Sequence, residues 1–247
     1  MQLPSALMDR GIHLIHRVPC CTNWPNDSIR RVQRPPSGPS FVREPPVNII
    51  RVMTLHKIME RPLVREGRKV SLGIHKRDEI PAMYSEFADS SVQQFLGRPD
   101  RLYYVEGEYD WYDKISRDET SRVMAILLNR KAGGGKDEGS FLLIGSVGIH
   151  GIDSISRYAE LGYLLFRKYW GKGYATEAVS LAVDYAFETL NLRKLFARVM
   201  EPNRASASVL EKNGFKPAGR LTGHVYLKSF GYANELYYEL HRGKHAL

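Results

Sequence analysis

Apolar and polar residues follow regular periods from about residue 61 onward, and the pattern is clearest between residues 161 and 191. Residues 161–166 form an almost unbroken apolar run, which is typical of a buried strand. From Ala175 to Leu190 the apolar residues recur at every third or fourth position, so they share one face of a helix. The pattern predicts a strand, a short turn and a helix, and we expect Asn191 to end that helix in a left-handed conformation.

The same periods divide the rest of the folded region into strands, helices and loops. Strands are predicted at residues 69–75, 122–130, 140–150, 194–200, 215–221 and 233–241. Helices are predicted at residues 77–88, 90–96, 107–116 and 204–212, with Ser90 or Ser91 as the N-cap of the second. Loops are expected at residues 131–139, where glycines are frequent but no helix follows, and at 222–232. Strands that outnumber interspersed helices indicate an α/β (α+β) fold, a sheet layered with helices.

Residues 1–60 differ from the remainder, because nine of the 13 prolines lie at or before Pro62. Proline removes a backbone donor and fixes φ, so this segment resists helix and sheet. We interpret residues 1–60 as a basic, disordered extension or a misassigned start, with Met53 and Met59 as later start positions, and residues 61–247 as the folded domain. The opening residues also match a transit peptide weakly.

Charge and cysteine content narrow the class of protein. The net charge is +9, but residues 1–67 contribute more than half of it, so the folded domain shows no basic stripe for nucleic acid. No run of 18 apolar residues occurs, so we expect no membrane span. The only cysteines, Cys20 and Cys21, are adjacent, which favours a cytoplasmic protein without disulfides. The eight histidines are scattered, so no metal site is predicted.

The turn between the strand at 161–166 and the following helix carries candidate chemistry. Gly171 and Gly173 leave space around the helix N-terminus, whose free N–H groups and dipole favour an anion. Lys168 and Lys172 add positive charge. Such a turn can hold a phosphate or a pyrophosphate, although its spacing fits neither common nucleotide-binding glycine motif.

Four motifs together resemble the GNAT superfamily of acetyl-CoA-dependent N-acetyltransferases, in particular its RimJ/RimL-like and spermidine N-acetyltransferase branches. They are AELGYLLF (159–166), KYWGKGYATEA (168–178), DYAFETLNLRKLFA (184–197) and NRASASVLEKNGF (203–215). The resemblance implies a mixed, mostly antiparallel central sheet with helices on both faces. It also implies acetyl transfer to a primary amine, either a protein N-terminus or a small amine such as a polyamine. The oligomeric state cannot be read from the sequence, and a homodimer is an assembly to test.

The resemblance also implies where acetyl-CoA binds. The amides of the glycine turn would hold the pyrophosphate, and the strand before it would splay from the strand after the helix so that the pantetheine arm lies between them. The implied binding residues are Leu164, Leu165, Phe166, Lys168, Trp170, Gly171, Lys172, Gly173, Tyr174, Ala175 and Asn203. Lysine at 168 replaces the usual glutamine or arginine and lacks a bidentate fork. Asn203 is expected to cap its helix as well.

An amine acceptor is protonated at neutral pH, so the reaction needs a base. Glu160, at the entry of the central strand, is the candidate base; its alternative is a solvated carboxylate. His150 is a second candidate because it titrates near neutrality. Leu210 occupies the position at which many family members have an acid tyrosine, which leaves Ser206 as the candidate acid. Because the acid tyrosine is absent, a non-catalytic CoA-binding or scaffold module remains an alternative function. Acylation of an antibiotic is a further alternative.

Overall fold

The computed structural model describes residues 61–95, 103–129 and 141–243. The predicted extension at residues 1–60, the predicted loop at 131–139 and the last residue of the predicted helix at 90–96 lie outside these ranges. All statements below concern the described residues.

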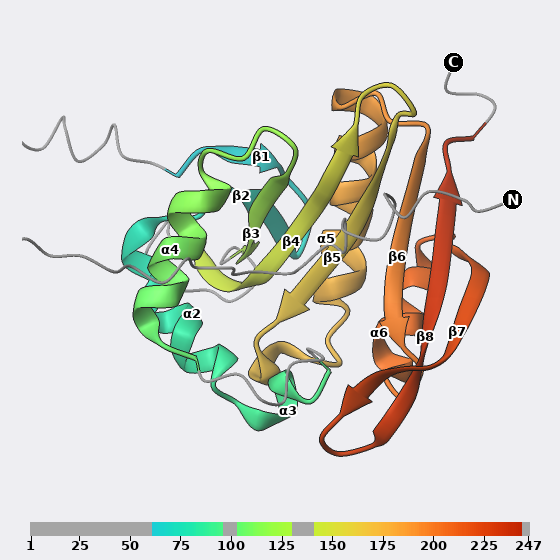
Figure 1. Cartoon of the computed structure of the whole chain (residues 1–247). Coiled ribbons are helices and arrows are strands. Elements are labelled where there is room, and N and C mark those ends of the chain that lie inside the picture. Colours follow the sequence, from blue (N-terminus) through green and yellow to red (C-terminus); the bar gives the residue numbers. More distant parts are fainter. Residues whose placement is uncertain (1–60, 96–102, 130–140, 244–247) are drawn as a thin grey trace, which may run out of the picture. The chain divides into compact units, whose positions relative to one another are not determined.

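One sheet contains all eight described strands, in the order β1-β2-β3-β4-β5-β6-β8-β7 (Figure 1). The strands are β1 (Leu63–Arg65), β2 (Val70–Gly73), β3 (Arg122–Leu128), β4 (Leu142–Asp153), β5 (Tyr158–Leu165), β6 (Lys194–Met200), β7 (Lys216–Leu227) and β8 (Gly231–His241). Every neighbouring pair is antiparallel except β5 and β6, which are parallel. The predicted mixed, mostly antiparallel sheet is therefore confirmed.

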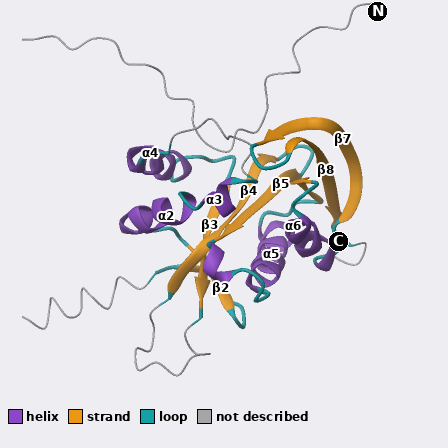
Figure 2. Ribbon diagram, turned by 90° about the horizontal axis from the view of Figure 1, so that it is seen from below, coloured by secondary structure: helices purple, strands orange, loops and turns teal. Residues whose placement is uncertain are grey.

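Helices lie on both faces of this sheet, as Figure 2 shows. They are α2 (Ile80–Phe87), α3 (Ser90–Gln93), α4 (Val105–Ile115), α5 (Tyr174–Asp184) and α6 (Arg204–Lys212). Helices α2 and α4 lie on one side, whereas α5 and α6 lie on the other. None of the helices in the described residues is both long enough and apolar enough to traverse a bilayer.

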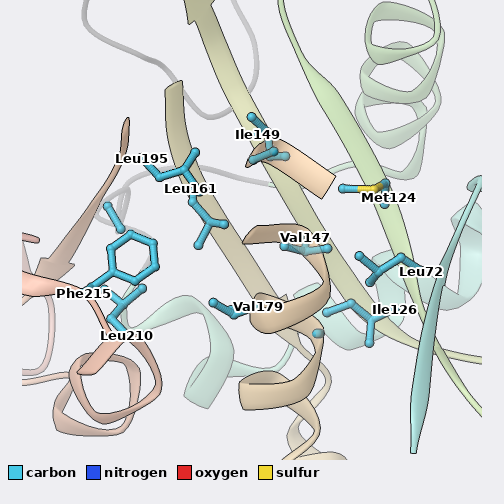
Figure 3. Packing of buried hydrophobic residues seen from close by; sticks show 14 of the residues in the cluster. Leu72, Met124, Ile126, Val147, Ile149, Leu161, Val179, Leu195, Leu210 and Phe215 are labelled. Atoms are coloured by element: carbon cyan, nitrogen blue, oxygen red, sulfur yellow. The ribbon is translucent and has the colours of Figure 1, made fainter. Parts of the chain in front are cut away.

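The core forms where α5 packs on the sheet. Ala178, Val179 and Ala182 are fully buried on the predicted apolar face and meet side chains such as Val147 and Leu161 from the strands (Figure 3). Small side chains let the helix lie close to the strands. The helix continues through a π-turn (Tyr185–Thr189) and stops where Asn191 takes a φ of 52°, so the predicted left-handed end is confirmed.

Strands β5 and β6 diverge soon after they begin. They pair only from Tyr158–Lys194 to Glu160–Phe196 in the described residues. Beyond that point β5 stays with β4 up to Leu165, and β6 stays with β8 up to Met200. The two strands separate in Figure 1. The splay that the family resemblance implied is therefore present, and one edge of β5 is left without a strand partner from residue 161 onward.

Two local predictions were wrong, and one short strand was missed. The expected loop at 222–232 is strand for most of its length, because β7 and β8 form one long hairpin. Strand β7 lies at the sheet edge with nearly all side chains exposed and with two register shifts, so no apolar alternation marks it. Strand β1 was not predicted because it has only three residues. The N-cap of α3 is Asp89, whose side chain accepts from the Ser91 N–H, rather than Ser90 or Ser91.

Candidate functional site

The glycine turn has the backbone geometry of an anion site. Gly171 and Gly173 have φ angles of 72° and 79°, a left-handed region in which a Cβ is strained, and a Cβ on Gly171 would meet no atom within 4 Å. The first hydrogen bond of α5 runs from the Glu177 N–H to the Gly173 carbonyl at 3.2 Å. The preceding first-turn amides therefore have no partner within the helix. Amides oriented in this way favour an anion such as a pyrophosphate.

Three lysines surround the turn. Lys168 Nζ is 3.0 Å from Glu86 Oε1, and the hydrogen bond to Glu86 raises the pKa of Lys168. Lys172 Nζ donates to the Lys168 carbonyl at 3.0 Å. Lys69, which the sequence did not mark, brings its Nζ within 3.5 Å of the Lys172 carbonyl oxygen and 3.6 Å of the Cβ position at Gly173. The turn thus combines oriented amides with several cationic groups.

The end of β5 contributes backbone rather than side chains. Leu165 and Phe166 are buried in the core, at 6% and 3% exposure, and Leu164 is half-buried. Trp170 fixes the turn, because its indole Nε1–H donates to the Leu165 carbonyl at 2.7 Å. Of the predicted cofactor residues in β5, Leu165 can offer only its main chain to a ligand, whereas the side chain of Leu164 is partly accessible. Tyr174 and Ala175 are half-buried in the first turn of α5.

Glu160 is buried and ion-paired, so the solvated-carboxylate alternative is wrong. Its Oε1 accepts from Arg198 Nε at 2.8 Å and its Oε2 from Arg198 Nη2 at 3.3 Å. Arg198 Nη1 also lies 3.5 Å from Glu235 Oε1. Burial raises the pKa of Glu160, and Arg198 opposes that rise. A raised pKa makes the carboxylate a stronger base than an exposed glutamate.

Glu235 and Arg198 are site residues that the sequence reading missed. A charged residue within β6, between the buried Ala197 and Val199, was the available signal. Glu235 Oε2 is buried and has no hydrogen-bond partner in the described part of the chain; His224 Nε2 is 3.8 Å away. One guanidinium therefore faces two buried carboxylates. Two carboxylates thus share one guanidinium, an arrangement whose charge suits a cationic acceptor.

His150 lies beside Glu160, because the two residues are direct partners across β4 and β5. Burial lowers the pKa of His150, although the nearby Asp118 carboxylate opposes the change. The ring rests over Gly148, where an added Cβ would be 2.2 Å from Nε2. The structure thus brings two predicted catalytic side chains to one face of the sheet and keeps the imidazole largely neutral.

Ser206 is in the first turn of α6, which Asn203 caps by accepting from the Ser206 N–H at 3.1 Å. The Ser206 hydroxyl lies 2.8 Å from the hydroxyl of Tyr163 on β5, and the Tyr163 hydroxyl also donates to the Ser206 carbonyl at 3.0 Å. Burial raises the pKa of Tyr163 to about 12. Leu210, by contrast, is 0% exposed and lies in the core. A hydroxyl at 210 would point into the core.

The sequence is similar to known acetyltransferases along most of the folded domain. The family model described as acetyltransferase (GNAT) domain matches residues 72–216. An uncharacterised N-acetyltransferase of Bacillus subtilis, YoaA, is 36% identical over 179 residues, which are 71% of this chain and 95% of that protein. The spermidine N(1)-acetyltransferase of Escherichia coli K12 is 29% identical over 70% of this chain and 80% of its own length.

Solved structures share the fold. A spermidine N-acetyltransferase from Vibrio cholerae, solved in complex with CoA and spermine, superposes with a TM-score of 0.63 at 20% identity. The match covers 72% of this chain and 99% of that one. At this identity the likeness concerns the fold.

Proposed function

Because this chain belongs to the GNAT acetyltransferase family, we propose that it transfers the acetyl group of acetyl-CoA to a primary amine held beside Glu160. The observation that carries this proposal is the divergence of β5 and β6. It begins at Glu160, the last residue of β5 that pairs with β6, and the open edge then leads to the glycine turn at Gly171 and Gly173. A long cosubstrate can therefore bind at the turn and still present its reactive end beside a buried carboxylate.

The turn and β5 would hold acetyl-CoA, which supplies the activated acetyl thioester. The first-turn amides of α5 and the lysines near them provide donors and charge for the pyrophosphate. The free edge of β5 provides N–H and C=O groups to an extended chain, as an added strand would. Asn203 caps α6 at the other side of the divergence. These contacts would together fix the cosubstrate along its length.

Glu160 would remove the proton from the bound ammonium group, after which the neutral amine attacks the thioester directly in a ternary complex. A positioned base contributes roughly a hundred- to ten-thousandfold in rate. Arg198 fixes the carboxylate through two hydrogen bonds, and burial raises its pKa. His150, on the same face, is placed to order the acceptor or a water beside Glu160.

The excess negative charge of the Glu160–Arg198–Glu235 group favours an acceptor that arrives as a cation. Both a protein N-terminus and a polyamine meet this requirement, and an antibiotic amine remains the third acceptor class. The alternative function is a CoA-binding module without catalysis, which the burial of Leu210 favours because the common acid position is lost. A cytoplasmic location and a homodimer remain predictions.

Turnover measurements separate these functions. We expect the full-length protein to release CoA from acetyl-CoA only when a suitable amine is present, in a panel of polyamines, amino-terminal peptides and aminoglycosides. The preferred acceptor identifies the substrate class. Tight CoA binding without turnover of any acceptor would show that the protein is a CoA-binding module without catalytic activity.

A further inference from the structure

A pair of hydroxyl groups crosses the divergence between β5 and the chain that follows β6. Tyr163 extends from β5 on the face that α5 and α6 cover, since it lies two positions from both Leu161 and Leu165 and therefore shares their buried face. Its hydroxyl reaches Ser206 in the first turn of α6, with an oxygen–oxygen distance of 2.8 Å. The pair therefore lies under the region where β5 and β6 are no longer hydrogen-bonded to each other.

We propose that Tyr163 and Ser206 act as a two-hydroxyl relay that donates a hydrogen bond to the leaving thiolate. This inference rests on the proposed function and adds a residue, Tyr163, that the sequence motif did not mark. Ser206 is the catalytic residue because it contacts the sulfur. Tyr163 is a positioning residue because it acts through Ser206.

The hydrogen-bond arrangement at rest explains why two hydroxyls are needed. The Tyr163 hydroxyl donates to the Ser206 carbonyl, so the Ser206 proton is free to point to the Tyr163 oxygen. When charge develops on sulfur, the Ser206 O–H turns to the sulfur. The Tyr163 O–H then turns from the carbonyl to Ser206 Oγ and satisfies the oxygen that has lost its partner. Hydrogen bonds to an ionised acceptor are about twice as strong as neutral ones.

The reaction balances without a change in the protonation of either hydroxyl. A bond forms between the amine nitrogen and the acetyl carbon, and the carbon–sulfur bond breaks with its electron pair on sulfur. Glu160 holds the first proton of the ammonium group. The proton that the nitrogen loses on becoming an amide neutralises the sulfur. Tyr163 keeps its proton throughout, consistent with a pKa of about 12 for its hydroxyl.

The buried Leu210 supports this assignment. Many family members place the acid tyrosine at this position, but here the side chain is fully buried beside Phe215. Tyr163 and Ser206 are the hydroxyls that the structure places at the divergence from opposite sides. The relay thus reaches this region from β5 and from the first turn of α6, whereas the acid tyrosine of many family members would come from the position of Leu210, later in α6.

A double-mutant cycle tests the relay. We expect Ser206→Ala and Tyr163→Phe each to lower kcat about tenfold, with little change in KM for acetyl-CoA, and the double variant to lose no more than either single variant. Tyr238→Phe is the matched control, because Tyr238 also sends its hydroxyl from the sheet to α6, where it donates to Glu211 Oε1 at 3.0 Å. Its kcat should stay within twofold of the wild type. Additive losses, or equal effects of Tyr163→Phe and Tyr238→Phe, would overturn the relay.

A binding measurement tests the relay without turnover. Calorimetric titrations at pH 7 to 9 compare CoA with desulfo-CoA, which lacks the thiol. Hydrogen-bond donors to the thiolate lower the pKa of the bound CoA thiol. The affinity of CoA relative to that of desulfo-CoA should therefore rise with pH in the wild type, by about tenfold for each unit by which the thiol pKa is lowered. The rise should be lost in Tyr163→Phe and kept in Tyr238→Phe. An unchanged rise in Tyr163→Phe contradicts the relay, whereas a wild type without turnover contradicts only the proposed function.

Discussion

At the scale of single residues, the proposed base is held by one guanidinium that is shared between two carboxylates. Arg198 holds both oxygens of Glu160 and also lies near Glu235, and all three side chains are largely withdrawn from water. Breaking such a pair leaves a buried charge without its partner, which is costly. Glu160 was predicted from the sequence, whereas Arg198 and Glu235 were missed; the charged position of Arg198 within β6 was a signal for one of them only. Their proximity follows from the pairing of β6 with β5 and β8, which sequence spacing does not encode.

The first prediction concerns the pH dependence of Glu160. Burial raises the pKa of this carboxylate above its usual range, and Arg198 counteracts the rise. A base works only when deprotonated, so activity should fall as pH drops through this pKa. Arg198→Gln removes the counteracting charge, so the pKa should rise further and the acidic limb of kcat should move toward neutral pH.

The matched control for this prediction is Arg220→Gln. Arg220 on β7 forms an ion pair with Glu201 at 3.4 Å, and more than half of its side chain is exposed. Removing this charge should leave the acidic limb of kcat in place. If the acidic limb of the kcat profile keeps its position in Arg198→Gln, or moves equally in both variants, then Arg198 does not control the pKa of Glu160.

At the scale of elements, the sequence predicted most of the fold, and its errors share one cause. Helix α5 was read correctly because one face is buried under the sheet and the opposite face meets water. Strand β7 was missed over residues 222–227 because an exposed edge strand buries no alternate positions. Asp89 was missed as a cap for a different reason, since Ser90, Ser91 and Asp89 are all good N-caps and only geometry chooses between them.

The glycine turn gives the second prediction. Gly173 is the N-cap of α5, and Gly173→Asp should place a negative side chain over the first-turn amides. We expect CoA affinity to fall tenfold or more, on the order of 1.4 kcal/mol. Gly231→Asp is the control, because Gly231 has a similar φ of 70° and open space around its Cβ position but lies in the β7–β8 hairpin. Titration calorimetry on the two folded variants measures their affinities for CoA. Equal CoA affinities would exclude the turn as the binding site.

At the scale of the whole molecule, family membership rests on residues 72–216, and the described domain spans residues 61–243. Residues 1–60 lie outside this match and outside the residues that the structure describes. Their proline content and excess of basic charge argue against burial of enough apolar surface to order the segment. We therefore propose that the domain functions alone.

The third prediction is that a chain beginning at Met53 keeps its stability and activity. Its Tm should lie within a few degrees of that of the full-length protein, since every core residue that the structure describes is kept. Thermal unfolding and acetyl-CoA turnover of the two chains, compared at equal concentration, provide the measurement. A large loss of either quantity would show that the first 52 residues belong to the functional unit.

The central claim is that the carboxylate at the point of strand divergence removes the proton from the acceptor amine. The direct measurement is steady-state turnover of Glu160→Gln with the preferred amine, together with CoA affinity of the same protein. We predict that turnover falls roughly a hundredfold or more while CoA affinity changes little, and that the acidic limb of the pH profile disappears. Wild-type turnover in Glu160→Gln would contradict the account, because the reaction would then proceed without its proposed base.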